Sequence, residues 1–274
     1  MKTSFDNLIY LKLGGSLITD KHQQCTPRLA IIRRLAVEMS QFYNSSSSTA
    51  ILIGHGAGSY GHIQVLHHNL LQSADSPVAW PGVLEVAKAI SQLNRIVHDE
   101  LLHAGLKTSL HHPSATAICH NGNLTTLDTT SIKHSLESGI IPIVHGDICF
   151  DEIHGASIVS TESIFVYLSK SLTPTNVYIA GVEEGVHTIY PDGDIIPFIS
   201  NSSNTTIFNG ITDSRSPDAT GGMRTKVQQM LYLTHQHPKV TVRIFSATEP
   251  DSLTETLSGM SSKGTIISDD DTYS

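Results

Sequence analysis

Three glycine-rich segments stand next to predicted strands or helices and could bind phosphate. They are Gly14-Gly15-Ser16, the segment 54–62 (GHGAGSYGH) and Gly221-Gly222. Because glycine has no Cβ, the backbone N–H groups of such a turn can approach an anion closely, and the start of a following helix adds positive potential. Together the three segments indicate a phosphate-binding site.

Three lysines lie close to these segments in the sequence. Lys12 stands inside an apolar run just before Gly14, Lys21 follows nine residues later, and Lys226 comes four residues after Gly222. A buried ammonium group is costly unless it reaches an anion. Two or three ammonium groups converging on a triphosphate would offset the charge of a phosphoryl group in transfer. The lysines therefore predict phosphoryl-transfer chemistry.

His62 closes the second glycine segment. An imidazole at this position could donate a hydrogen bond to the phosphate of an acceptor and, when protonated, form an ion pair with it. The chain has 16 histidines, and we interpret pairs such as His67-His68 and His111-His112 as ordinary surface or core residues. His62 is thus the histidine that we expect to bind substrate.

The glycines Gly56, Gly58 and Gly61 also satisfy the G-x-G-x-x-G pattern of dinucleotide-binding folds. That fold places an acidic residue after a second strand about 20 residues further on, whereas the segment around Asp75 is broken by Pro77 and then becomes helical. The sequence has no Walker A loop, G-x-S-x-G elbow or H-E-x-x-H helix. A dinucleotide-dependent oxidoreductase stays an alternative, and it would give Lys21 no role.

The elements that must position these residues follow an α/β pattern. Short runs rich in Ile, Val and Leu alternate with longer helical stretches, which indicates parallel strands covered on both faces. Thr26 and Pro27 are expected to cap the first helix and Gly105 to end a later one. The predicted strands are 8–13, 50–53, 140–144, 176–180 and 239–245, and the predicted helices are 28–43, 82–105, 162–171 and 223–236 with another after Ile63.

Composition narrows the class of protein. The 274 residues are 39% hydrophobic and 15% charged, with a mean hydropathy of −0.04, which is typical of a compact globule. The net charge of −8, without a basic stripe, argues against a nucleic-acid partner. No apolar run approaches the ~18 residues of a membrane span, and the N-terminal segment differs from a signal peptide, so we predict a cytoplasmic protein with no membrane partner.

The three cysteines do not indicate a disulfide or a metal site. Cys25, Cys119 and Cys149 are odd in number and lie far apart, so they predict neither a disulfide framework nor a zinc cage.

Four segments taken together resemble the amino acid kinase superfamily in order and spacing. They are 11–21 (LKLGGSLITDK), 54–62, 145–147 (HGD) and 218–226 (DATGGMRTK). The opening segment combined with GAGSYGH is similar to the isopentenyl phosphate kinases, in which the final histidine of the loop holds the acceptor's phosphate. The resemblance covers roughly residues 8–267. It implies ATP- and Mg²⁺-dependent phosphorylation of a small-molecule isoprenoid monophosphate, isopentenyl phosphate, to isopentenyl diphosphate.

The resemblance also implies an open αβα sandwich around a mainly parallel sheet that usually forms a homodimer. We expect one compact domain with an N-terminal acceptor lobe, 1–172, and a C-terminal nucleotide lobe, 173–274. The implied catalytic residues are Lys12, Lys21, His62 and Lys226, with Lys21 stabilising the transition state. The implied nucleotide-binding residues are Lys12, Gly14, Gly15, Ser16, Gly58, Gly181, Gly185, Asp218, Gly222 and Lys226, and the implied substrate-binding residues are Ala57, Gly58, His62 and Thr161.

No metal ligand is assigned, although Asp147 is a candidate for organising the site or binding Mg²⁺. An isoprenoid tail needs an apolar slot. Its candidates are Val65, Leu66, Leu70, Trp80, Val83, Val86 and Ile90.

Two segments depart from the family pattern. Where related kinases commonly show S-G-D, this chain has Ser160-Thr161-Glu162, and the turn often written T-D-V-x-G-V-Y is here 181–187 (GVEEGVH). The contact at Thr161, the reach of Glu162 and the nucleotide contacts of the turn are therefore open. Two other functions stay open as well: a kinase for a phosphonate such as fosfomycin, and a nucleotide-binding module without catalysis.

Overall fold

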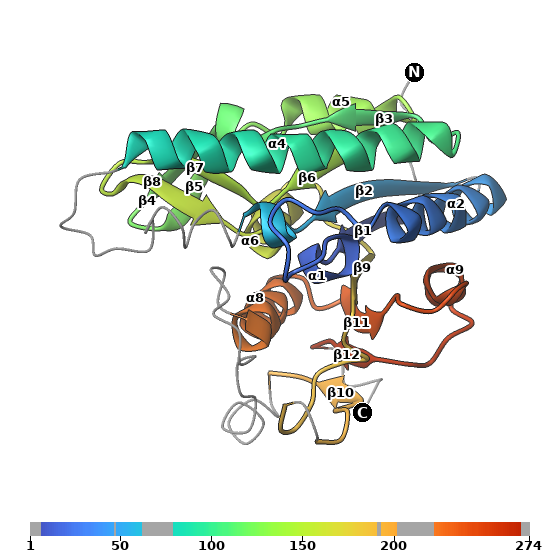
Figure 1. Ribbon diagram of the computed structural model, residues 1–274. Helices are drawn as coiled ribbons and strands as arrows, with labels where there is room; N and C mark the ends of the chain where they lie inside the picture. The colour runs from blue at the N-terminus through green and yellow to red at the C-terminus, as the bar shows by residue number, and fades with distance from the viewer. Residues whose placement is uncertain (1–6, 47, 62–78, 191–192, 202–221, 270–274) are drawn as a thin grey trace.

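A central sheet of eight strands organises the molecule (Figure 1). The computed structural model describes residues 7–46, 48–61, 79–190, 193–201 and 222–269. The strand order is β10-β12-β11-β9-β1-β2-β6-β3, with β11–β12 antiparallel and the other pairs parallel, so the prediction of a mainly parallel sheet is confirmed. The strands are β1 (Asn7–Leu13), β2 (Thr49–His55), β3 (Thr108–Leu110), β6 (Ile141–His145), β9 (Asn176–Gly181), β10 (Phe198–Ile199), β11 (Thr241–Ser246) and β12 (Thr265–Ile267).

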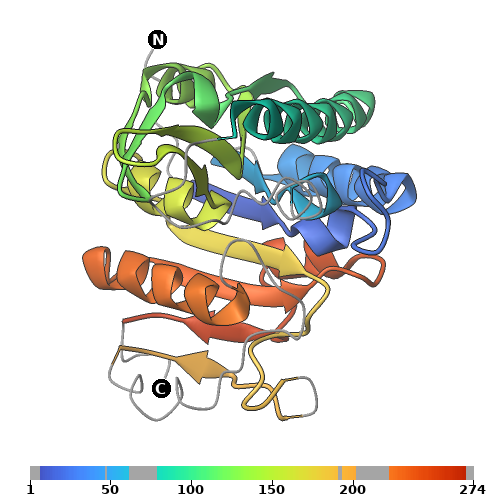
Figure 2. The same ribbon diagram turned by 60° about the vertical axis from the view of Figure 1, so that its left-hand side comes forward.

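Helices cover both faces of this sheet because alternate residues of each strand point to opposite sides. On β1, Ile9, Leu11 and Leu13 pack in one core, whereas Leu8 and Tyr10 pack in the other. In Figure 2 the yellow to red strands of the C-terminal half lie beside blue β1, with α8 crossing one face. The first core contains α1 (Gly15–Ile18), α2 (Leu29–Ser45), α4 (Trp80–His103) and α9 (Ser252–Leu257), and the second contains α5 (Thr130–Glu137), α6 (Thr161–Ser169) and α8 (Gly222–Gln236).

A second, four-stranded sheet was not predicted from the sequence. Its order is β5 (Asn123–Leu127), β4 (Ala117–His120), β7 (Asp147–Asp151) and β8 (Gly155–Val159). Asp151 holds its turns together, since its carboxylate accepts the N–H groups of Gly122 and His154 at 2.7 and 2.9 Å. These strands are short and carry many exposed polar residues, so they lack the apolar runs that mark the central sheet.

The predicted elements within the described residues are confirmed with small shifts in their bounds, and the helix predicted after Ile63 lies outside those residues. Gly105 ends α4 with a φ of +87°, as expected of a glycine that follows a helix. The expected cap of α2 was wrong: the helix begins at Leu29 with Arg28 as its N-cap, not at Thr26-Pro27. The reason is that Thr26 accepts the N–H of Asp20 and Arg28 donates to Ile18, so this segment pairs with the end of α1 instead.

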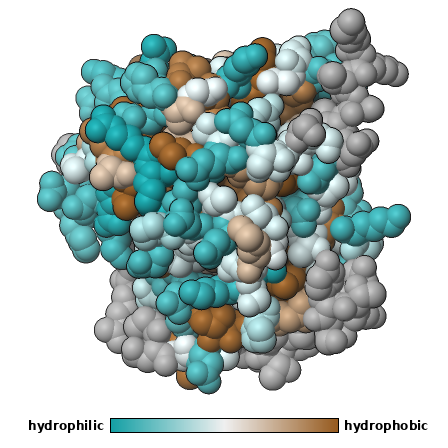
Figure 3. Space-filling view, turned by 90° about the vertical axis from the view of Figure 1, so that its right-hand side faces the viewer, coloured by the Kyte–Doolittle hydropathy of each residue, from teal (hydrophilic) through white to brown (hydrophobic). Residues whose placement is uncertain are grey.

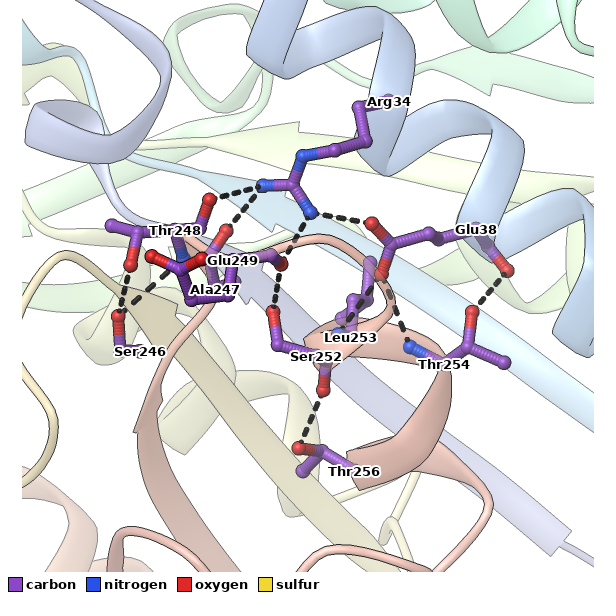
Figure 4. A network of polar contacts seen from close by, with 10 residues as sticks. All are labelled: Arg34, Glu38, Ser246, Ala247, Thr248, Glu249, Ser252, Leu253, Thr254 and Thr256. Atoms are coloured by element: carbon purple, nitrogen blue, oxygen red, sulfur yellow. Dashed lines mark hydrogen bonds and ion pairs between the residues drawn. The ribbon is translucent and has the colours of Figure 1, made fainter.

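A polar network joins α2 to the segment that follows β11 (Figure 4). The Arg34 guanidinium donates to the carbonyls of Ala247 (2.5 Å) and Glu249 (2.8 Å) and forms an ion pair with Glu38. The other Glu38 oxygen accepts the N–H of Leu253 at 3.0 Å, at the start of α9. Glu38 is 3% exposed. The network therefore fixes the path of the chain from β11 into α9.

The surface that Figure 3 shows is mixed in character. Hydrophobic residues form separate small groups among hydrophilic ones on this face, as is common where a protein meets water. Within the described parts of the chain, no helix combines the length and the apolar character needed to cross a membrane.

Candidate active site

The site lies at one edge of the central sheet, where adjacent parallel strands end in glycine. Gly14 follows β1, Gly56 follows β2, Gly146 follows β6, and Gly181 is the last residue of β9. Parallel strands place their carboxyl ends at the same edge, and ligands of open α/β sheets bind there. The fold thus brings together segments that are up to 167 residues apart in the sequence, Gly14 and Gly181.

The first two glycine segments touch through their backbones. A Cβ placed on Gly15 would lie 2.4 Å from the nitrogen of Gly58, and one on Gly56 would lie 2.8 Å from the nitrogen of Gly15. Gly58 has a φ of +51°, and a Cβ there would meet the Thr19 hydroxyl. Side chains would therefore force the two segments apart, which explains glycine at these positions.

Backbone N–H groups of both segments are available to a ligand. Among the described residues, no acceptor is present for the N–H groups of Gly15, Ser16, Ala57 and Gly58. Other groups nearby are occupied, since Ser59 donates to Thr19 Oγ1 at 3.0 Å and Gly14 donates to Ala180 at 2.8 Å. Unpaired N–H groups clustered on glycine turns form a concave site that suits a phosphate.

Lys12 reaches this site from within β1. Its side chain is buried and forms an ion pair with Glu162, in the first turn of α6. Burial alone would raise the pKa of Glu162, but the positive charges of Lys12 and Lys226 and the hydrogen bond from Lys12 hold that pKa below its usual value. Glu162 is therefore ionised and organises two of the predicted lysines.

The helix start that carries Glu162 is fixed by its neighbours. Ser160 caps α6 by accepting the N–H of Ser163 at 3.0 Å. Gln229 of α8 donates to Ser163 at 2.7 Å and accepts from Ser160 at 3.2 Å, which ties α8 to this turn. The tie brings Lys226, one turn earlier on α8, near Glu162.

Thr161 has its side chain turned toward β2. Its hydroxyl donates to the carbonyl of His55 at 2.8 Å, and its methyl group occupies the space above Gly54, where a Cβ would lie 2.5 Å from it. The Ser160-Thr161-Glu162 departure is thus accommodated: Gly54 leaves room for the threonine, and the longer glutamate reaches Lys12.

The remaining predicted site residues have fewer described contacts or lie outside the described part of the chain. Lys21 is exposed in the turn after Thr19, and no described residue holds its ammonium group. Gly222 begins α8 with a φ of +64°. His62 and Asp218 lie outside the described residues, as does Gly221.

The turn after β9 packs against the C-terminal strands. The Gly181 carbonyl accepts the N–H of Ala247 at 2.9 Å, so the turn adjoins the Arg34 network. A Cβ on Gly185 would lie 2.8 Å from both Ile195 and Thr265, which explains the glycine there. The fold therefore places Gly181 and Gly185 beside the segments that follow β11 and precede β12.

Part of the predicted apolar slot lies against the second glycine segment. Val86 and Ile90 of α4 form a small buried cluster with Ala57 and with Ile158 of β8. Trp80 is 41% exposed and packs on Phe150 instead, with ring centroids 5.7 Å apart. Val83 is buried, and Val65, Leu66 and Leu70 lie outside the described residues.

Asp147 lies in a cluster with His112 and His145. Its oxygens accept the N–H groups of Ser114 (3.0 Å) and Ile148 (2.9 Å), and burial raises its pKa. His112, His145 and Asp147 have nitrogen and oxygen atoms close enough to hold a metal ion. Mg²⁺ prefers oxygen ligands, so this mixed set does not fit the magnesium role suggested for Asp147.

Sequence comparison decides the family. The sequence profile of the amino acid kinase family matches residues 7–246. The chain belongs to the amino acid kinase family.

Its relatives within that family share a name. The isopentenyl phosphate kinase of Methanothermobacter thermautotrophicus is 28% identical over 270 residues, with 95% of this chain and 98% of the relative covered. The isopentenyl phosphate kinase of Haloferax volcanii is 31% identical over 228 residues, covering 83% and 88%. The resemblance to isopentenyl phosphate kinases that the motifs predict is confirmed.

Solved structures agree with this fold. An X-ray structure of an isopentenyl phosphate kinase matches with a TM-score of 0.80 and 26% identity, covering 96% of this chain and 100% of the other. Carbamate kinase from Giardia lamblia, bound to AMP-PNP, matches with a TM-score of 0.71 at 13% identity, which shows the shared fold. The predicted αβα sandwich is therefore the amino acid kinase fold.

Sequence reasoning left two features of this amino acid kinase site unassigned. Glu162 was treated as a departure, because its place two residues after the capping Ser160 marks it only as an acidic residue in the first turn of a helix. His55 and His145 were not singled out, although each ends an apolar strand immediately before a glycine. That shared position was the available signal.

Gly15→Ala should reduce kcat at least about 100-fold, because the new Cβ would separate the two glycine segments and a shift of about 1 Å at a reacting centre costs that much. The rate of ADP release and the melting temperature check this. Wild-type kcat in a folded Gly15→Ala protein would contradict the packing of these two segments.

The buried histidines should make stability depend on pH. Burial lowers the pKa of His55 and of His145 from 6.5 to about 4, so both are neutral in the folded protein at pH 7. Below pH 6.5 the unfolded chain binds protons that the folded chain does not, so stability is full above pH 6.5 and falls toward pH 4. We expect a loss of about 3 kcal/mol per histidine.

Denaturant unfolding at pH 7 and pH 4.5 measures this dependence. Asp147, with a raised pKa, acts in the opposite direction, so the informative quantity is the difference between wild type and His55→Asn. The variant should lose less stability on acidification than wild type. Identical losses would show that His55 does not carry the pH dependence.

Proposed function

We propose that this chain transfers the γ-phosphoryl group of ATP to isopentenyl phosphate, giving isopentenyl diphosphate and ADP. The observation that carries the proposal is the pair of touching glycine segments with available N–H groups, next to buried Lys12 and its partner Glu162. The relatives named isopentenyl phosphate kinase support the choice of acceptor.

Charge repulsion is the main obstacle to this reaction. The acceptor is already a phosphate, largely ionised at pH 7, so no general base is needed to make its oxygen nucleophilic. Two anions must instead be held in line, and the ammonium groups and N–H groups offset their repulsion. We assign Lys12 and Lys226 to the nucleotide phosphates, with Gly14, Gly15, Ser16 and Gly58 providing backbone contacts.

Several parts of the proposal rest on family resemblance. Mg²⁺ would enter bound to the phosphate oxygens of ATP and neutralise their charge, and we assign it no side-chain ligand. Asp218, Gly181, Gly185 and Gly222 would contact the nucleotide from the 173–274 lobe. Ala57, Gly58, His62 and Thr161 would contact the acceptor from the 1–172 lobe. A homodimer and a cytoplasmic location complete the proposal.

We assign the hydrocarbon tail of the acceptor to the side of Ala57 that carries a small apolar cluster. Val86, Ile90 and Ile158 pack against Ala57 there. This favours an isoprenoid phosphate over a small polar phosphonate such as fosfomycin. The ion pair from Glu162 to Lys12 likewise favours an active kinase over a silent nucleotide-binding module, because the altered carboxylate still meets its lysine.

Product analysis tests the proposal directly. Incubation with Mg-ATP and isopentenyl phosphate should give, by ³¹P NMR, the two coupled signals of a diphosphate ester together with ADP. Appearance of inorganic phosphate and ADP alone would show hydrolysis and would contradict the assigned acceptor.

His62→Ala and Lys21→Ala separate the two assigned roles. His62→Ala should raise the KM for isopentenyl phosphate at least about tenfold and leave ATP binding unchanged, because it removes a charge-assisted bond to the acceptor. Lys21→Ala should lower kcat with a smaller effect on either KM. Equal weakening of both substrates in either variant would contradict these roles.

A further inference from the structure

Two buried histidines end neighbouring strands where the second glycine segment begins. His55 and His145 are the last residues of β2 and β6, and they are paired in register. Both are fully buried, and their rings stack with centroids 5.3 Å apart at an angle of 23°. The reaction as described above uses neither ring.

Each ring contacts the carbonyl of the glycine that follows it. His55 Nδ1 lies 3.1 Å from the Gly56 oxygen, and His145 Nδ1 lies 3.1 Å from the Gly146 oxygen. A carbonyl oxygen only accepts hydrogen bonds, so each Nδ1 must carry the proton. Because both rings are neutral at pH 7, each Nε2 then has a lone pair and needs a donor.

Each Nε2 has a polar partner on the far side of its ring. His112 Nδ1 lies 3.1 Å from His145 Nε2, and Asn94 Oδ1 lies 3.0 Å from His55 Nε2, while Asn94 Nδ2 is buried without a partner among the described residues. The lone pair on His55 Nε2 requires the NH₂ group of Asn94, which a half-turn of the amide presents. Asn94 is fully buried and comes from α4, so the tautomer of His55 is selected by a helix that also lines the apolar cluster.

The bond to Gly56 has a consequence for the next peptide group. In a trans peptide the C=O and N–H point in opposite directions. With the Gly56 oxygen held toward His55, the N–H of Ala57 points away from the ring, and no described residue accepts it. The imidazole thereby sets the direction of one of the available N–H groups.

We propose that His55, held in its Nδ1–H tautomer by Asn94, is a positioning residue that aims the Ala57 N–H at the acceptor's phosphate. The proposal rests on the proposed function, since it names a group that orients the same acceptor segment. His145 of β6 and His112, which follows β3, form the matching pair and support the stacked ring.

Two substitutions separate positioning from packing. In His55→Asn the side-chain amide falls where Nδ1 was and can still donate to Gly56, whereas in His55→Gln the amide falls near Nε2 and cannot. Glutamine is closer to histidine in volume, so a packing role predicts that His55→Gln is the milder change. Positioning predicts the reverse order.

We expect His55→Asn to keep the KM for isopentenyl phosphate near wild type and His55→Gln to raise it about tenfold, the effect of one lost hydrogen bond at a charged group. The KM for ATP should change in neither variant. A milder His55→Gln, or equal effects on both substrates, would overturn the proposal.

A measurement on the unaltered protein covers the case in which the variants fail to fold. Long-range ¹H–¹⁵N spectra at pH 7 should show His55 and His145 as neutral Nδ1–H tautomers. Protonation of His55 at Nε2 would overturn the proposal. A wild-type protein that ignores isopentenyl phosphate would instead defeat the proposed function and leave the tautomer result standing.

Discussion

Replacing Lys12 by methionine should reduce kcat by about 100- to 1000-fold, the usual effect of removing one preorganised group that stabilises developing charge. Lys12 is the buried ammonium group next to the glycine segments, and it is paired with Glu162. Methionine keeps the unbranched shape of the side chain and removes its charge. The rate of ADP release with Mg-ATP and isopentenyl phosphate measures the effect.

The same substitution leaves the Glu162 carboxylate buried with Lys226 as its remaining cation. Leaving a buried charge with no partner at all costs about 3–5 kcal/mol, so we expect a smaller loss of stability here. The double variant Lys12→Met with Glu162→Gln removes the uncompensated charge and should regain stability without regaining kcat. Recovery of activity in the double variant would mean that the single substitution acts through folding. Wild-type kcat in a folded Lys12→Met protein would remove Lys12 from the catalytic set.

Glu38→Ala should lower the free energy of unfolding by about 3–5 kcal/mol, because it breaks a buried ion pair and leaves the first N–H groups of α9 without their acceptor. The remaining Arg34 guanidinium keeps only its carbonyl partners around Ala247 (Figure 4). Denaturant unfolding at pH 7.5, followed by circular dichroism, measures the loss.

Asp99→Ala is the matched control. Asp99 forms a pair with Arg95 on the exposed face of α4 with the same four-residue spacing, and such pairs contribute less than about 1 kcal/mol. If Glu38→Ala and Asp99→Ala cost the same, the network does not fix the path from β11 into α9.

The sequence predicts the central sheet well because its strands are buried on both faces. Runs such as 8–13 and 176–180 are mostly apolar, apart from Lys12 and Asn176, and that pattern has few other solutions. The strand β5, in contrast, has exposed threonines and follows the turn at Asn121-Gly122, so its pattern is that of a polar turn. Its place depends on Asp151 and on β4, which are tertiary contacts.

In the candidate site, too, residues with an unusual local pattern could be predicted, whereas pairs made by tertiary contacts could not. Gly15, Gly58 and Lys12 could be singled out because glycine after a strand and lysine within one are both unusual locally. The ion pair of Lys12 with Glu162 joins residues 150 apart in the chain, and no local pattern predicts which carboxylate a buried lysine meets. The same holds for His55 and Asn94, which meet only when α4 packs on the sheet.

The measurement that tests the central claim most directly compares acceptors at equal concentration. ADP release from Mg-ATP would be followed with isopentenyl phosphate, dimethylallyl phosphate, fosfomycin, UMP and N-acetylglutamate. We predict rapid turnover with the two isoprenoid phosphates and little with the other three. Turnover confined to fosfomycin, UMP or N-acetylglutamate would contradict the assignment of an isoprenoid phosphate as the acceptor. Absence of turnover with all five compounds, despite measurable ATP binding, would contradict it as well.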